Sequence, residues 1–161
     1  MKYSLKLTFP LLCVVLIIFA CKKKEIPPVE KKIEPPKETK LELLTKHKWV
    51  LYERKVNPGD SSVYEDYASC FKDNSYEYLT SSIFVKDEGS TKCFASDPQI
   101  DSTANWELKQ DSLFVNYPLG NGQFYKESYF IIEITKTNMI LSSFQMVNKE
   151  KITYTSFYKP L

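Results

Sequence analysis

The sequence predicts an all-β protein, an eight-stranded antiparallel up-and-down barrel with a short N-terminal helix. Short alternating apolar and polar runs are separated by polar turns, and no helical segment lies between them. The chain carries 11 Tyr, 10 Phe and 2 Trp but only four Gly, and aromatic enrichment favours strands. Short connections make neighbouring strands pair antiparallel, and closure into a barrel removes the exposed edges of an open sheet.

The N-terminal segment is typical of a secretory signal. Lys2 and Lys6 form a basic start, and residues 7–20 form a mostly apolar stretch that is short for a membrane span. We therefore predict a signal peptide over residues 1–20. An uncleaved signal anchor is the alternative.

The end of this segment resembles a bacterial lipobox. Residues 18–21 read Ile-Phe-Ala-Cys, so cleavage after Ala20 leaves Cys21 as an acylated N-terminus, for example with palmitate. Two or more acyl chains anchor a protein stably to a membrane. Lys22 stands where an inner-membrane retention signal would have aspartate, which favours an outer-membrane lipoprotein facing either the periplasm or the outside.

Residues 21–40 are expected to be a tether behind the lipidated cysteine. This segment is rich in Pro, Lys and Glu, with the pairs Pro27-Pro28 and Pro35-Pro36 and no aromatic residue. Such a composition favours an extended, solvated chain. A spacer is the simplest interpretation, and a site for an envelope polymer, an anionic lipid or a Pro-binding groove is the alternative.

Length and charge limit the rest of the chain, residues 41–161, to one domain. About 120 residues are enough for a single domain. The formal net charge of the chain is +2, and its basic excess lies in the signal and the tether, so the domain itself is slightly acidic. A nucleic-acid-binding surface needs a basic stripe, so this class of partner is not expected.

The first half of the domain begins with a short apolar segment, 41–47, predicted as a helix that plugs one barrel end. The first strand then ends at the turn Asn57-Pro58-Gly59-Asp60, where Pro presets φ and Gly permits positive φ. Residues 61–69 are expected to be a polar rim loop, and residues 96–102 a second loop. The strands predicted in this half are 48–56, 75–80, 82–86 and 105–109.

The second half is expected to be a meander. The turn Gln110-Asp111 precedes its first strand, and a longer turn is predicted over 117–122. The later turns are two or three residues long, which makes the flanking strands pair as antiparallel neighbours. The strands predicted in this half are 112–116, 128–135, 138–147 and 151–158.

Several motifs resemble those of bacterial, Bacteroidota-type lipocalin-like lipoproteins. Residues 43–49 are similar to the start of that family, LLxGKW, with His47 in the position of its glycine. The run from Cys70 to Tyr78 is similar to its CxKDDxYxF motif, and Asp87-Glu88-Gly89 follows in the same order. The resemblance spans about residues 41–161 and implies a lipocalin-like barrel, without naming a ligand.

Cys70 and Cys93 are the two cysteines that follow the leader and tether. An exported chain meets an oxidising compartment, so these cysteines are expected to form a structural disulfide. A redox pair or a metal site is the alternative. Neither is favoured, because no CxxC is present and His47, the single histidine, has no ligand-like spacing.

No catalytic constellation is recognisable, so we do not expect an enzyme, a bound metal or a cofactor. A Ser–His–Asp triad would have to use His47, and no nucleophile elbow is present. Asp87 and Glu88 are adjacent carboxylates beside Gly89, and a solvated turn is the simpler interpretation of them.

Aromatic and aliphatic strand positions are the remaining functional signal. They predict either a cavity for a small hydrophobic ligand or a filled barrel core that serves as a structural or protein-interaction module of the envelope. The protein partner of such a module is unknown. The predicted cavity or core residues are Trp49, Leu51, Tyr76, Tyr78, Phe84, Trp106, Leu108, Phe114, Phe130, Ile132 and Tyr154.

Overall fold

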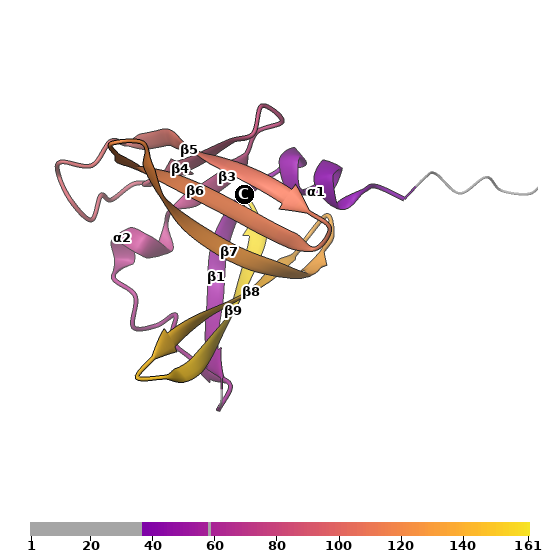
Figure 1. Cartoon of the computed structure of the whole chain (residues 1–161), viewed down its shortest axis with the longest axis vertical. Helices are drawn as coiled ribbons and strands as arrows, with labels where there is room; N and C mark the ends of the chain where they lie inside the picture. The colour runs from indigo at the N-terminus through magenta and orange to yellow at the C-terminus, as the bar shows by residue number, and fades with distance from the viewer. Residues whose placement is uncertain (1–36, 58) are drawn as a thin grey trace, which may run out of the picture. The chain divides into compact units, whose positions relative to one another are not determined.

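The computed structural model describes residues 37–57 and 59–161, which form a closed antiparallel β-barrel (Figure 1). Eight strands follow one another around the wall, and β1 pairs with β9 to close it. The predicted eight-stranded, lipocalin-like up-and-down barrel is therefore confirmed. The wall strands are β1 (Lys48–Asn57), β3 (Ser75–Tyr78), β4 (Ile83–Asp87), β5 (Ile100–Lys109), β6 (Ser112–Gly120), β7 (Gln123–Ile134), β8 (Met139–Val147) and β9 (Glu150–Pro160).

Two short elements occupy the region around the predicted rim loop 61–69. The two-residue strand β2 (Ser61–Ser62) pairs with the end of β1, and the helix α2 (Ser69–Lys72) follows. Strand β5 also begins at Ile100, inside the predicted loop 96–102. Hydrophobic alternation did not reveal these elements because few of their residues face the core.

The β6–β7 hairpin is longer than predicted. The six-residue turn expected over 117–122 is wrong, because both strands continue until only Asn121 and Gly122 remain between them. Both residues have positive φ, at 51° and 72°, as the tight hairpin turns that match strand twist require. The extension brings Tyr117 opposite Tyr125 in the wall.

Helix α1 (Lys40–Lys46) precedes the first strand, as predicted. Thr39 and Glu42 form a capping box at its start, so the ordered contacts begin just before residue 41. Leu43 and Leu44 are buried in the core, and the Leu44 carbonyl accepts a hydrogen bond of 3.1 Å from Nε1 of Trp49. The helix therefore fills one end of the barrel.

The barrel core lies at the end that α1 fills. Its central side chains are almost fully inaccessible to solvent, including those of Trp49, Leu113 and Met139. The complete cluster is Leu43, Leu44, Trp49, Tyr78, Phe84, Ala104, Trp106, Leu113, Val115, Ile131, Ile134, Met139 and Leu141. Burial of this apolar surface is the main favourable contribution to folding.

The barrel wall is split between β7 and β8 at the other end. These strands pair only through Phe130–Ile134 and Met139–Ser142. From Ser143 onward β8 pairs with β9 alone, and the first half of β7 pairs with β6 alone. In Figure 1 the yellow β8–β9 hairpin accordingly diverges from the orange β7.

The signal peptide 1–20, Cys21 and nearly all of the tether 21–40 lie outside the described residues, so their predictions remain predictions. Among the residues that are described, no helix has the length and apolar character needed to cross a membrane.

Candidate ligand-binding cavity

A disulfide bond joins Cys70 to Cys93, with an S–S distance of 2.00 Å, which confirms the predicted pairing. Cys70 lies in α2, and Cys93 lies in the loop that leads to β5. The bond therefore attaches α2 to the β4–β5 connection. Ala68 and Phe71, on either side of Cys70, line the cavity described below.

The motif residues around this disulfide hold the loops together. The Asp73 carboxylate accepts hydrogen bonds from the backbone and hydroxyl groups of Ser90 and Thr91, and these bonds lower its pKa. Gly89 packs against Asp73 so closely that an added Cβ would lie 2.4 Å from the Asp73 carbonyl oxygen. The role of this motif is therefore structural.

The solvated-turn interpretation of Asp87 and Glu88 is wrong for Glu88. Its side chain is buried and forms a 2.5 Å ion pair with Lys86. Asp87 accepts hydrogen bonds from the Gly89 backbone and the Gln99 side chain. Lys86 and Glu88 are two residues apart at the end of β4, a spacing that puts both side chains on one face of an extended chain, so the sequence did carry a signal for this pair.

A cavity of about 690 Å³ lies inside the barrel, partly covered by residues 66–71. Its wall combines aromatic rings with four charged side chains. The lining residues are Leu51, Arg54, Asp66, Tyr67, Ala68, Phe71, Tyr76, Tyr78, Phe84, Lys86, Val115, Tyr117, Glu127, Tyr129 and Tyr158. A volume of this size is within the range of small-molecule sites.

Aromatic rings form a continuous chain along the cavity wall. Tyr76 stacks on Phe84 with ring centroids 6.1 Å apart and meets Tyr158 edge to face at 6.0 Å. Phe84 in turn meets Tyr117 at 6.0 Å. Such a wall offers apolar faces to a ligand body and hydroxyl groups to its polar end.

Glu127 is the carboxylate inside this aromatic wall. Its Oε2 accepts hydrogen bonds from the hydroxyls of Tyr117 and Tyr129, at 3.3 and 2.5 Å. Burial raises the pKa of both tyrosines far above the usual value, and the Glu127 charge adds to the effect. Burial also raises the pKa of Tyr76 to about 12. These hydroxyls therefore stay protonated and remain donors at neutral pH.

The cations of the cavity have partners of their own. Lys86 pairs with Glu88 as described above. Arg54 donates a 2.6 Å hydrogen bond from Nη1 to the Tyr67 hydroxyl, and its guanidinium lies 4.6 Å from the ring centre of Tyr154. The Nε of Arg54 is buried without a hydrogen-bond acceptor among the described residues.

Most of the predicted cavity or core residues face the barrel interior. Leu51, Tyr76, Tyr78 and Phe84 line the cavity. Trp49 and Trp106 are buried in the core and Leu108 packs against it, while Tyr154 lies beneath Arg54. The Trp106 indole donates to the Leu79 carbonyl at 2.9 Å. The barrel is thus filled at one end and hollow at the other.

Phe114, Phe130 and Ile132 were placed in the interior, and this prediction is wrong. Phe130 and Ile132 are each 53% exposed, while their neighbour Ile131 is buried. Phe114 pairs with Ser128 and lies beneath the ammonium group of Lys126, 3.9 Å from the ring centre. Alternation along β6 and β7 sends these three side chains outward, since Leu113, Val115 and Ile131 occupy the inward positions.

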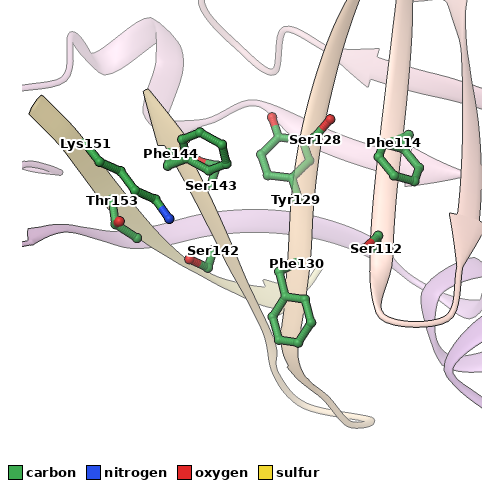
Figure 2. A pocket seen from close by; sticks show the side chains of 10 residues that line it. All are labelled: Ser112, Phe114, Ser128, Tyr129, Phe130, Ser142, Ser143, Phe144, Lys151 and Thr153. Carbon is green, nitrogen blue, oxygen red and sulfur yellow. The ribbon is translucent and has the colours of Figure 1, made fainter. Parts of the chain in front are cut away.

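The exposed rings contribute to a shallow groove of about 330 Å³ on the outer face. Figure 2 shows Phe114, Phe130 and Phe144 around it, with serines between them. Tyr129 lines both this groove and the inner cavity. The groove therefore lies at the split between β7 and β8.

Sequence reasoning missed most of the polar cavity residues, including Arg54, Lys86, Glu127 and Tyr129. The alternating set Tyr125, Glu127, Tyr129 and Ile131 carried the signal, because it places a charge on the face that also carries Ile131. The missed hairpin extension hid this pattern, since residues 123–127 were not assigned to a strand.

A metal site has no support among residues 37–57 and 59–161, where no group of three or more His, Cys, Asp and Glu converges. His47 follows helix α1 and packs edge to face on Trp49, with ring centroids 5.6 Å apart. Its position next to the core is consistent with a packing role.

The fold and the cavity define the described domain as an eight-stranded lipocalin-like barrel with one packed end and one hollow end. Comparisons with protein-family models, with curated proteins and with solved structures found no match.

Proposed function

We propose that this chain is a membrane-anchored, lipocalin-like binding protein that holds a small, largely apolar ligand. The cavity of about 690 Å³ carries this proposal. Its aromatic wall supplies apolar contact area, and its few polar groups supply orientation, which is the usual composition of a small-molecule site. Arg54 and Lys86 already interact with Tyr67 and Glu88, so the polar groups of the cavity are held in place before a ligand enters.

The cell envelope is the proposed location. Cys21 ends an apolar leader and would carry the lipid, and the tether 22–40 would separate the barrel from the membrane. The disulfide between Cys70 and Cys93 supports an oxidising compartment. We further propose the outer membrane, because Lys22 stands where an inner-membrane retention signal would have aspartate.

Extraction of the full chain from its own envelope tests the binding function. We expect native mass spectrometry to show a bound small molecule that is lost on denaturation. Val115→Phe places a ring in the cavity and should abolish the bound mass, whereas Asn116→Phe, on the opposite face of the same strand, should keep it. A wild-type protein without bound mass, together with identical binding of an added apolar dye by both variants, contradicts the proposal.

An interaction module is the second candidate function. The outer groove of Phe114, Phe130 and Phe144 favours it, because exposed aromatic clusters often mark contact surfaces. Phe124, which is exposed and lies on the same face of β7 as Phe130, extends the apolar surface of this strand pair, and Tyr125 is exposed on the opposite face of the strand. Photo-crosslinking from position 144 in cells should capture one reproducible protein, and a crosslinker at the exposed Asn105 should not.

A further inference from the structure

The charge distribution inside the cavity points to a particular class of ligand. Glu127 faces the cavity, and the ion pairs among the described residues do not include it. Both tyrosine hydroxyls that it binds donate to the same oxygen, Oε2. Among the described residues Oε1 therefore accepts no hydrogen bond and the carboxylate has no counter-ion within ion-pair distance.

Among the other charged residues of the cavity, only Lys86 has a counter-ion, whereas Arg54 and Asp66 are in no ion pair among the described residues. Lys86 is neutralised by Glu88 at 2.5 Å. Arg54 is bound to Tyr67 and lies against the Tyr154 ring. Asp66 is exposed on the covering loop, where water solvates it. A charge in a partly desolvated site is stabilised strongly by an opposite charge, so Glu127 favours a cationic ligand group.

The rings around Glu127 favour the same class. Tyr76, Phe84, Tyr117 and Tyr158 form a chain of neighbours with centroids about 6 Å apart. Aromatic faces attract ammonium groups through the negative potential of the ring, and such cages recognise organic cations in many proteins. The same rings also offer apolar area to the hydrocarbon or aromatic body of a ligand.

We infer that the ligand is an amphipathic organic cation, whose ammonium group pairs with Oε1 of Glu127 and whose apolar body lies against the aromatic wall. This inference rests on the proposed binding function. An anionic headgroup is the competing occupant, because Arg54 Nε is buried without an acceptor. The two occupants differ in charge, so one series of probes separates them.

The probes are 4-phenylbutylamine, 5-phenylvalerate and 4-phenylbutanol, which share a phenylbutyl body and differ in the headgroup. They are titrated calorimetrically into the full chain in a mild detergent, with detergent alone as the blank. We expect the amine to bind about tenfold or more tightly than the alcohol, because a charge-assisted hydrogen bond is formed in a low-dielectric site. The carboxylate should bind more weakly than the alcohol.

Glu127→Gln removes the charge and keeps the shape, and it should weaken amine binding about tenfold. Glu133→Gln is the matched control, because Glu133 lies in the same strand, is exposed and changes the net charge equally. It should leave all three affinities unchanged. The probe series on the unmodified chain remains decisive if Glu127→Gln does not fold.

Tightest binding by the carboxylate, or unchanged amine binding in Glu127→Gln, overturns the cationic ligand and leaves the binding function intact. Absence of binding by all three probes overturns the cationic ligand as well. If native extraction also yields no bound mass, the binding function itself fails.

Discussion

At the scale of single residues, Gly89 shows how a motif position is fixed by packing. Its contact with Asp73 leaves no room for a side chain, and its φ of 70° also favours glycine. Gly122 has nearly the same φ, 72°, but an added Cβ would meet no atom within 4 Å. Substitutions at the two positions therefore distinguish the effect of backbone strain alone from that of strain combined with steric overlap.

Gly89→Ala should lower the free energy of unfolding by about 3 kcal/mol or more, because the new methyl group adds a clash to the strain of positive φ. Gly122→Ala should cost only about 1–2 kcal/mol, from the backbone conformation alone. Urea unfolding followed by tryptophan fluorescence measures both. Equal losses would show that Asp73 moves away at little cost and that the contact is not restrictive.

At the scale of elements, strand β7 decides which side chains enter the barrel. Ile131 is almost fully buried, whereas Ile132, the next residue, is 53% exposed. The pairing of β7 with β8 shifts register between Ile131 and Glu133, so Ile132 lies at the irregularity. Inward and outward faces of β7 are therefore set by its pairing with β6 and β8.

Ile131→Ala should destabilise the barrel by about 2–5 kcal/mol, because it removes buried methyl groups and leaves a cavity. Ile132→Ala makes the same substitution on the outer face, and it should lower the free energy of unfolding by less than about 1 kcal/mol. Chemical denaturation of the two variants compares them directly. A larger loss in Ile132→Ala would mean that the register of β7 is shifted by one residue.

The disulfide links helix α2 to the loop that precedes β5. It closes a loop with a sequence separation of 23 residues, so its removal should lower stability by about 3 kcal/mol in the chain-entropy description. We expect the double variant Cys70→Ser and Cys93→Ser to melt at a lower temperature than the wild type. Alkylation followed by mass measurement should find neither cysteine free in the wild type, and two free thiols there would refute the pairing in solution.

At the scale of the whole molecule, the barrel is packed at the end filled by α1 and hollow at the end covered by residues 66–71. The core cluster and the cavity share Tyr78, Phe84 and Val115, so the packed region continues into one wall of the cavity. Charged groups such as Glu127 and Arg54 can therefore line the hollow end without removing the apolar contacts that stabilise the fold. This division is how one small domain can combine a stable fold with a binding cavity.

Attachment to the membrane also concerns the molecule as a whole. Cys21→Ala should abolish incorporation of an alkynyl fatty acid and release the chain from the membrane fraction, since the proposed acyl anchor is lost. Cys13→Ala is the control, because Cys13 lies within the predicted signal and should not affect labelling. Unchanged labelling of Cys21→Ala would exclude Cys21 as the lipidation site.

Local patterns in the sequence were sufficient to predict the eight strands, their order, the N-terminal helix and the disulfide. The strands, their order and the helix depend on contacts between near neighbours or on short turns such as Gln110-Asp111, and the disulfide follows from there being two cysteines after the leader and tether. Alternation along one strand has only two phases, however, and it does not say which phase faces the core. Phe130 and Ile132 were misplaced for this reason.

Only the tertiary structure decided where the barrel is hollow and what lines the hollow. The closure of β1 on β9 and the register shifts in the wall bring Arg54, Tyr158, Tyr117 and Glu127 around one space. These residues come from distant parts of the chain, and no local pattern couples them. The sequence by itself therefore determined a barrel, and long-range pairing determined a cavity with a carboxylate that makes no ion pair within the described part of the chain.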